Sequence, residues 1–345
     1  MNKRMLKSAV IYGCGKAGER FCKVIENRND MKILAIIDPK FAELKSMKSK
    51  KMYESFKKFR EFNFLNPDFF IVATIDKDHF ENFMNIKRFY PNSKIITEKP
   101  LCKKSEEVSN IIAKFKNEEI VIHFVERYSL AVPIARDFIK THCLRPVRAI
   151  TFWGKNRLGD QRDTMGVYSE ISHSIDLVWF ICNYSFENQH EISEPIGARS
   201  DFNGVNTMKT DSISFNLKDK ETDFFCTFHS SFMWHKRKRE IVIYLKSHVN
   251  KVYMICIEFD SPEWDFDQIR IMKFHKNNWK MCFEKKYSPI KNKIIGNQKI
   301  DRFLSSVLYE KYRNVYGVPC LQNGVFVQRI LNEAMKGERH ETKFY

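Results

Sequence analysis

The sequence predicts an α/β protein of two domains. Three observations support this fold class. Short apolar runs alternate with amphipathic helical segments up to residue 125, a glycine-rich loop follows the first run, and later runs alternate apolar with polar residues. Continuous apolar runs are typical of parallel strands buried on both faces, whereas alternation is typical of antiparallel sheets. We therefore expect a Rossmann dinucleotide-binding domain at residues 1–125 and an α+β domain with a large, mostly antiparallel sheet at residues 126–345.

The N-terminal half is expected to alternate strands with helices. The predicted strands are Ser8–Tyr12, Lys32–Ile37, Phe69–Thr74, Lys94–Thr97 and Ile120–Val125, and the predicted helices are Ala17–Asn27, Asp78–Phe89 and Ser105–Lys116. The lysine-rich segment after Pro39 is expected to be helix or loop. Right-handed crossovers then join these strands into one sheet.

The C-terminal half is expected to combine a sheet with flanking helices. The predicted strands are Val147–Trp153, Ser212–Phe215, Phe224–His229, Glu240–Leu245, Val252–Phe259 and Ile269–Phe274, and the predicted helices are Ala131–Ile139, Tyr168–Ile181, Asp301–Tyr312 and Leu321–Met335. Polar clusters such as Lys276–Asn278 predict turns. The basic run His235–Arg239 is also predicted to be an exposed turn.

Composition narrows the class of function. The formal charge of +17 is spread along the chain rather than gathered in a patch with interleaved aromatic residues, so we expect no nucleic-acid partner. No apolar run approaches the roughly 20 residues of a membrane-spanning helix, so no membrane partner is expected. The nine cysteines are scattered and form no Cys-x-x-Cys pair, which predicts a reducing cytoplasm and no metal site.

The glycine-rich loop consists of Gly13, Cys14, Gly15, Lys16, Ala17 and Gly18. The first glycine permits a tight turn, the second lets the backbone approach a pyrophosphate, and the third lets helix and strand pack closely. The following helix N-terminus supplies amides to the anion. Asp38, which ends the second strand, can accept hydrogen bonds from the adenosine ribose and disfavours a 2′-phosphate. We expect NAD, while Lys40 leaves NADP open; the alternative is a turn that only caps a helix.

A second signal is the Glu98-Lys99-Pro100 segment at the end of the fourth predicted strand. Adjacent side chains at a strand end diverge, and proline prevents the strand from continuing. Together with the glycine loop, this pattern predicts a lysine delivered to the cofactor. The alternative is a charged exit from a strand.

With these segments identified, the chain resembles the glucose-fructose oxidoreductase and inositol dehydrogenase family, Gfo/Idh/MocA. The resemblance spans the whole architecture and lies in the glycine loop, Asp38, Ala73-Thr74 followed by His79, and above all Glu98-Lys99-Pro100-Leu101. Further on, Phe124–Tyr128 stands where the family tends to have an Asn-Arg-Arg-Phe-like segment. The stretch Gly166–Asp176 is similar to the family's helix with a glycine, an acid and His-x-x-Asp.

The resemblance implies a nicotinamide-dependent oxidoreductase with its active site between the domains. The implied cofactor contacts outside the glycine loop are Asp38, Ala73, Thr74, His79, Glu98, Lys99 and Pro100. The implied catalytic residues are Lys99, Glu170, His173 and Asp176, and the implied substrate contacts are Lys99, Glu126, Arg127, Tyr128, Trp153, Lys155, Arg157 and His173. Core hydrogen bonding for His173 and Asp176, and interface packing for Arg127 and Tyr128, remain alternatives.

The chain departs from the family pattern at three positions. Ser169 stands where the family usually has its acid, Met165 replaces a glycine, and Glu126 replaces the amide expected before Arg127. Because three and four residues both return to the same helix face, Glu170 is expected to share a stripe with His173 and Asp176. These departures put the substrate in doubt more than the reaction type.

The expected reaction is reversible hydride transfer between the nicotinamide and a secondary alcohol or ketone. His173 would exchange the hydroxyl proton and Lys99 would stabilise charge on the reacting oxygen. Sugars, cyclitols and nucleotide-linked sugars are the implied substrates, some of them anionic, and a homodimer or homotetramer is implied. One alternative is reduction of a C=N or C=C bond; another is a non-catalytic dinucleotide sensor or scaffold.

Overall fold

The computed structural model describes residues 6–43, 50–62, 66–157, 164–184, 189–200, 209–290 and 297–343. The chain forms two compact units. Unit 1 comprises Met1–His123 and Val318–Gln328, and unit 2 comprises Phe124–Gly317 and Arg329–Tyr345. The first crossing lies close to the division expected after residue 125, whereas the return of Val318–Gln328 to unit 1 was not expected from the sequence.

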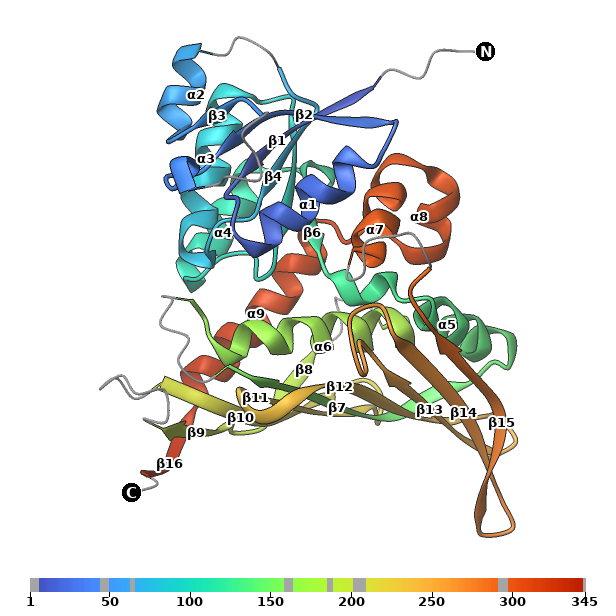
Figure 1. The fold of residues 1–345 in the computed structure, drawn as a ribbon. Helices are drawn as coiled ribbons and strands as arrows, with labels where there is room; N and C mark the ends of the chain where they lie inside the picture. Colours follow the sequence, from blue (N-terminus) through green and yellow to red (C-terminus); the bar gives the residue numbers. More distant parts are fainter. Residues whose placement is uncertain are drawn as a thin grey trace. The chain divides into compact units, whose positions relative to one another are not determined.

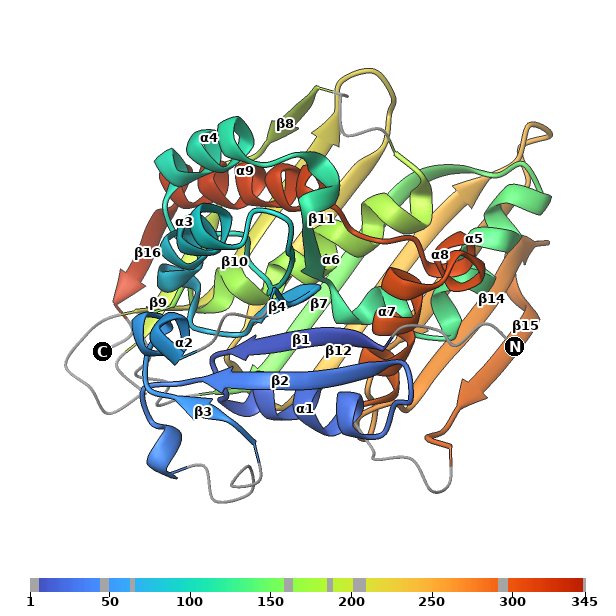
Figure 2. The same ribbon diagram turned by 90° about the horizontal axis from the view of Figure 1, so that it is seen from above.

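Unit 1 is built on a six-stranded sheet with the order β3-β2-β1-β4-β5-β6 (Figures 1 and 2). All neighbouring strands in it run parallel. Its strands are β1 (Lys7–Tyr12), β2 (Met31–Ile37), β3 (Met52–Tyr53), β4 (Phe69–Val72), β5 (Lys94–Glu98) and β6 (Ile120–His123), and its helices are α1 (Lys16–Glu26), α2 (Phe56–Phe62), α3 (His79–Phe89) and α4 (Ser105–Lys114). The predicted Rossmann domain is confirmed.

The strand order of unit 1 reverses between β1 and β4. In open parallel sheets, ligands bind outside the carboxyl ends of the strands at such a reversal. The short strand β3, in the lysine-rich region predicted as helix or loop, was missed because two residues carry no periodicity. The N-terminal part of α9 (Leu321–Gly337) also belongs to this unit, where the amide of Ile122 donates to Pro319 O at 2.9 Å.

Unit 2 is built on a ten-stranded sheet with the order β15-β14-β13-β12-β7-β11-β10-β9-β16, and β8 pairs with β10. Only the β7–β11 and β9–β16 pairs are parallel among the pairs described. Its strands are β7 (Arg145–Asn156), β8 (His190–Ile192), β9 (Ile196–Ser200), β10 (Lys209–Asp219), β11 (Phe225–Ser231), β12 (Met233–Lys246), β13 (Val252–Glu258), β14 (Asp267–His275), β15 (Asn278–Tyr287) and β16 (Arg339–Lys343). The predicted, mostly antiparallel sheet is confirmed.

Helices cover one face of this sheet. Helices α5 (Ala131–Thr141) and α6 (Val167–Cys182) pack on its strands, α7 (Gln298–Leu308) and α8 (Glu310–Tyr316) pack on each other, and the C-terminal part of α9 also belongs to this unit. Helix α6 packs on β7, β10 and β11 (Figure 1). Nearly all of its side chains are buried. The single helix predicted for Asp301–Tyr312 is divided because Tyr309 adopts an extended conformation between α7 and α8.

The prediction for the basic run His235–Arg239 is wrong. It lies within β12, where Lys238 pairs with Gly154 and Arg239 with Trp153 of β7 across an irregular register. A charged run was taken as a solvated turn, but the Arg239 side chain points inward and meets buried carboxylates. The turn predicted at Lys276–Asn278 does connect β14 to β15, with positive φ at Lys276 and Asn277.

Candidate active site

The glycines of the glycine-rich loop in unit 1 have two different roles, one in packing and one in leaving space for a ligand. Gly13 has φ +89°, and a Cβ there would lie 2.7 Å from the Thr74 amide nitrogen; a Cβ on Gly18 would lie 2.1 Å from Gly13 O. These two glycines are therefore required by the fold itself. A Cβ on Gly15 would meet no atom within 4 Å, so this position faces open space. A pyrophosphate can approach the backbone there, at the N-terminus of α1.

Asp38 is held against the same loop. Its Oδ2 accepts a hydrogen bond from the Cys14 amide at 2.7 Å, and its Oδ1 accepts one from the Lys40 amide at 2.8 Å. Each carboxylate oxygen has a second lone pair, so both can still accept a hydrogen bond from a ribose hydroxyl. The Cys14 side chain is buried, and the hydrogen bond from the Cys22 thiol lowers its pKa. The loop, Asp38 and the open space at Gly15 thus fit a dinucleotide.

His79 connects the segments that follow β4 and β5. Its Nδ1 lies 2.9 Å from Pro100 O, and its Nε2 lies 3.3 Å from Thr74 O. Asn82, which the sequence did not single out, donates to Thr74 Oγ1 at 3.0 Å. The amide of Ala73 donates to Tyr12 O at 2.7 Å, next to the glycine loop. Residues predicted separately therefore form one edge of the sheet.

Glu98 and Lys99 lie at that same edge. Glu98 Oε1 is 2.8 Å from Nδ1 of His123, which ends the neighbouring strand β6 and was not predicted as a site residue. Burial alone would raise the pKa of Glu98, but the charges of His123, Lys99 and Arg20 outweigh it and lower that pKa. Lys99 is partly exposed, and its peptide bond to Pro100 is cis. The strand end therefore presents an ionised carboxylate beside an accessible ammonium group.

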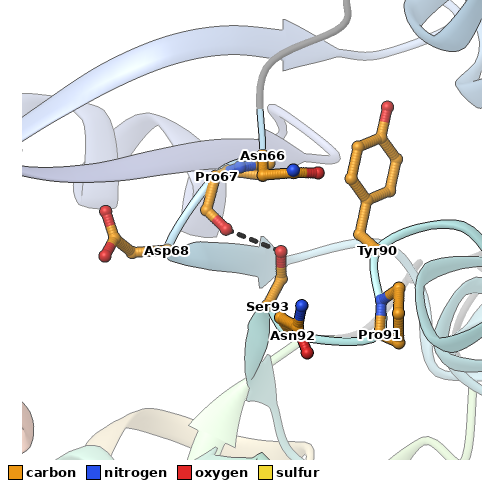
Figure 3. Close-up of a pocket in the computed structure, with 7 residues that line it drawn as sticks. All are labelled: Asn66, Pro67, Asp68, Tyr90, Pro91, Asn92 and Ser93. Carbon is orange, nitrogen blue, oxygen red and sulfur yellow. Dashed lines mark hydrogen bonds between the residues drawn. The ribbon is translucent and has the colours of Figure 1, made fainter.

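A cavity of about 210 Å³ in unit 1 lies elsewhere (Figure 3). It is lined by Asn66, Pro67, Asp68, Tyr90, Pro91, Asn92 and Ser93. These residues precede β4 and β5, so the cavity is at the amino ends of the strands, whereas the glycine loop is at their carboxyl ends. Its polar groups are engaged locally: Ser93 Oγ donates to Pro67 O at 2.6 Å, and Asp68 accepts from Lys7 at 2.8 Å. The cavity forms no part of the candidate active site.

Helix α6 carries three of the predicted residues of unit 2, but they face different partners. Glu170 lies 2.5 Å from Lys155 Nζ, 3.6 Å from Arg157 Nη1 and 3.9 Å from Arg239 Nη2. Asp176 pairs with Arg127 through two hydrogen bonds, one of them from Nε at 2.5 Å. His173 is buried between these positions.

Helical geometry explains why the expected common stripe is divided. Each step of three residues falls about 60° short of a full turn, so two steps place Asp176 about 120° from Glu170. Asp176 therefore turns away from the Glu170 side of the helix. Burial raises its pKa, although the Arg127 guanidinium opposes that shift.

Glu126 belongs to a set of buried ionic side chains. It accepts hydrogen bonds from Arg239 and, at 2.6 Å, from Lys299 Nζ. Asp260 accepts from Arg239 at 2.7 Å and from Lys299 at 2.8 Å, and Asp267 accepts from Lys299 at 2.9 Å. Burial, together with the charge of Asp260, raises the pKa of Glu126. In this unit Glu126 is directed at Lys299 and Arg239, which explains why an acid stands where an amide was expected.

We refer to Glu126, Lys155, Arg157, Glu170, Arg239, Asp260, Asp267 and Lys299 as the charge network. Its four acidic groups balance its four basic groups. The side chains of Lys155 and Arg157 are the most exposed members, at 21% and 33%. Glu170 lies against both Lys155 and Arg157 and offsets part of their charge. This part of unit 2 is therefore not a strongly positive patch.

Tyr128 and Trp153 pack within unit 2. The Tyr128 ring lies 5.2 Å from that of Phe303, and its hydroxyl donates to Gly317 O at 3.4 Å. Trp153 is 1% exposed and its ring lies 5.9 Å from that of Phe259. Because these contacts of Tyr128 lie inside unit 2, they decide neither for substrate contact nor for interface packing.

Two features are absent from the residues that the structure describes. No helix there has both the length and the apolar composition needed to cross a membrane. In the same ranges, no group of three or more His, Cys, Asp or Glu side chains is arranged to hold a metal ion.

Comparison with known proteins agrees with the geometry of unit 1. Residues 7–125 match the family model described as "Oxidoreductase family, NAD-binding Rossmann fold", GFO_IDH_MocA. The N-terminal domain is thus similar to the NAD-binding Rossmann domain of the Gfo/Idh/MocA oxidoreductases. The expected NAD-binding oxidoreductase domain is thereby confirmed. A search of curated protein sequences finds no match.

Solved structures share the fold of nearly the whole chain. A myo-inositol dehydrogenase from Corynebacterium glutamicum is 13% identical with a TM-score of 0.69, covering 97% of each chain. UDP-N-acetylglucosamine 3-dehydrogenase from Acidithiobacillus ferrooxidans is 13% identical with a TM-score of 0.69, covering 96% of each chain. A levoglucosan dehydrogenase in complex with NADH is 12% identical with a TM-score of 0.75, covering 96% of this chain and 97% of that one. The similarity to these solved structures therefore includes the fold of unit 2 as well as that of unit 1.

Proposed function

We propose that this protein is a Gfo/Idh/MocA oxidoreductase that transfers a hydride between NAD and a secondary alcohol or ketone of a sugar, cyclitol or nucleotide-linked sugar. The observation that supports the reaction most is the carboxyl edge of the unit 1 sheet. There a dinucleotide cradle stands beside Lys99, which is partly exposed and follows a fixed carboxylate. The substrate class is suggested by solved structures of the same fold, whose names specify myo-inositol, UDP-N-acetylglucosamine and levoglucosan.

Each polar residue at the strand end has a distinct task in this proposal. Bound NAD supplies the hydride acceptor. Gly15 and the amides that open α1 bind the pyrophosphate, and Asp38 binds the adenosine ribose. Lys99 donates a hydrogen bond to the reacting oxygen and stabilises the negative charge that develops on it. Glu98 places a negative charge next to Lys99 at the strand end. Its contact with His123 holds the end of β5 against β6.

His173 is proposed as the group that exchanges the hydroxyl proton. Imidazole suits this task because its ordinary pKa of about 6.5 lies near neutrality. Glu170 lies on the preceding turn of α6 and forms an ion pair with Lys155. We therefore assign Glu170 to holding this face of α6 in place, and not to proton transfer. Asp176 is proposed as a positioning residue, since both of its oxygens are engaged by Arg127.

Two substitutions test this assignment. Lys99→Met and His173→Asn should each lower kcat by about 10²- to 10⁴-fold. The matched controls are Lys94→Met, at the exposed start of the same strand, and His275→Asn, at the exposed end of β14 in unit 2. Turnover is followed as NADH formation with a panel of cyclitols, sugars and nucleotide-linked sugars. Unchanged kcat in both variants would reject the catalytic assignment.

We further propose a homo-oligomer in a reducing, cytoplasmic compartment. All nine cysteines are free of disulfides. Strand β15 ends the unit 2 sheet and exposes Trp279 and Met281, which lie two positions apart in one continuous register and therefore share one face. An apolar strand face of this kind is typical of a surface that another subunit covers. Light scattering tests this proposal, and a monomer throughout the micromolar range would contradict it.

A further inference from the structure

We propose that His123 is a positioning residue, which orients Glu98 for binding of the dinucleotide at the strand end of unit 1. The inference rests on the proposed function, because it assigns Glu98 to the dinucleotide site. It concerns a residue that neither the glycine loop nor the Glu98-Lys99-Pro100 segment includes. His123 contacts Glu98 rather than the reacting atoms, so its role is indirect.

The register of two strands brings the pair together. Glu98 and His123 are opposite each other at the ends of β5 and β6, which run parallel. Glu98 Oε1 lies 2.8 Å from His123 Nδ1. An ionised carboxylate can only accept hydrogen bonds, so Nδ1 carries the proton in this contact. The side chain of His123 is 3% exposed and that of Glu98 is 20% exposed, so the carboxylate is anchored from within and still reachable by a ligand.

Helix α1 packs against the imidazole ring of His123. The ring of Phe21 packs edge-on against His123, with centroids 4.9 Å apart and planes at 61°. Phe21 is fully buried in α1, whose N-terminus forms the pyrophosphate cradle after Gly15. His123 therefore links the helix that receives the phosphates to the carboxylate beside Lys99. Removal of the imidazole would release Glu98 from this arrangement.

Three basic side chains face Glu98, and each comes from a different part of the chain. They are His123 on β6, Lys99 next to it in the chain, and Arg20 on α1. Burial favours the protonated acid, whereas these groups favour the carboxylate and together lower the pKa of Glu98. Without His123, burial is opposed only by Lys99 and Arg20, so the pKa of Glu98 rises. Protonation of Glu98 at mildly acidic pH would then weaken any hydrogen bond it accepts from the dinucleotide.

The test compares His123→Leu with His123→Asn by titrating NADH and following nicotinamide fluorescence from about pH 5 to 8, a range that brackets ordinary carboxyl and imidazole pKa values. Asparagine retains an N–H close to the position of Nδ1, whereas leucine retains only bulk. We expect the Asn variant to match the Kd of the wild type near neutral pH, because it keeps the hydrogen bond, and to lose less affinity than the Leu variant at the acidic end, where it lacks only the charge of His123. The Leu variant should lose about tenfold in affinity, or about 1.4 kcal/mol, at the acidic end.

Glu98→Gln supplies the second arm. In that background no carboxylate remains to be oriented, so adding His123→Leu should change Kd by less than about twofold, within the additivity expected for independent sites. If His123→Leu fails to fold, His123→Gln takes its place, because its amide extends past the position of Nδ1. An unaltered Kd and pH profile in the loss variant, or an equal loss in the Glu98→Gln background, overturns the inference.

This experiment separates the inference from the proposed function. NADH binding requires no substrate, so the role of His123 can hold even if Lys99→Met leaves turnover intact and the catalytic assignment fails. Conversely, loss of turnover in Lys99→Met together with a wild-type binding profile in His123→Leu supports the function and rejects the inference. Failure of the wild-type protein to bind NADH rejects both.

Discussion

The strand-end site of unit 1 and the charge network of unit 2 both gather polar side chains, but they do so in opposite ways. At the strand end, contacts join residues about two dozen positions apart, as in Cys14 with Asp38 or Glu98 with His123, and acceptors keep spare capacity. In the charge network, Glu126 is joined to Arg239 and Lys299 over separations of 113 and 173 residues, and its groups neutralise one another. The proposed ligand site keeps hydrogen-bonding capacity for a ligand, whereas the polar groups of the charge network are paired with one another and stabilise the fold.

The largest expected effect is on the charge network. Lys299→Met leaves the buried carboxylates of Glu126 and Asp260 with Arg239 as their remaining cation, and it removes the cation that pairs with Asp267. Removing one partner of a buried ion pair typically costs about 3–5 kcal/mol, because the remaining charge stays buried without compensation. We expect a loss of that size in the free energy of unfolding, measured with urea. Lys286→Met on the exposed strand β15 is the control, with a change of about 0.5 kcal/mol or less.

The deficit of Lys299→Met should depend on pH in a defined direction. Burial alone would raise the pKa of Asp260, but Lys299 and Arg239 outweigh it and lower that pKa below its ordinary value of 3.8. A lowered folded-state pKa contributes stability that is present above the unfolded pKa and is lost as pH falls through the folded one. The variant lacks part of this contribution. Its deficit should therefore be largest near neutral pH and shrink below about pH 4; a deficit that grows on acidification would contradict the assignment.

The same contrast explains which parts could be predicted from sequence. The glycine loop, Asp38 and Glu98-Lys99 were identified because each depends on a local pattern at the end of a strand. The inward-facing Arg239 was missed because its partner acids lie far away in the chain. Without them, a run of five basic residues predicts a turn. His123 was also missed because its partner is distant in the sequence, although less so than the partners of Arg239. Only the strand register places His123 opposite Glu98.

The glycine loop allows the two kinds of role to be separated within unit 1. Gly18→Ala should cost about 1–3 kcal/mol, as overpacking does, because the new methyl would lie 2.1 Å from the backbone oxygen of Gly13. Gly15→Ala should leave the free energy of unfolding within about 0.5 kcal/mol, since the methyl enters open space. That space is where the pyrophosphate is proposed to bind, so this variant should lose NADH affinity instead. Equal losses of stability in the two variants would show that Gly15 also serves packing.

The smallest effect is expected at Asp38, where a ligand contact and a loop contact share one carboxylate. Asp38→Asn should keep the length of the side chain and one oxygen acceptor for the Cys14 or Lys40 amide. It removes the charge, so NADH affinity should fall about tenfold, equivalent to about 1.4 kcal/mol, as a charge-assisted hydrogen bond becomes a neutral one. NADPH affinity should fall less or rise, because the repulsion of a 2′-phosphate is relieved. The ratio of the two Kd values, measured by nicotinamide fluorescence, is the deciding quantity. A wild-type protein that prefers NADPH, or an Asn variant with an unchanged ratio, would show that the Asp38 carboxylate only holds the glycine loop. Its role would then be structural, like that of the charge network in unit 2.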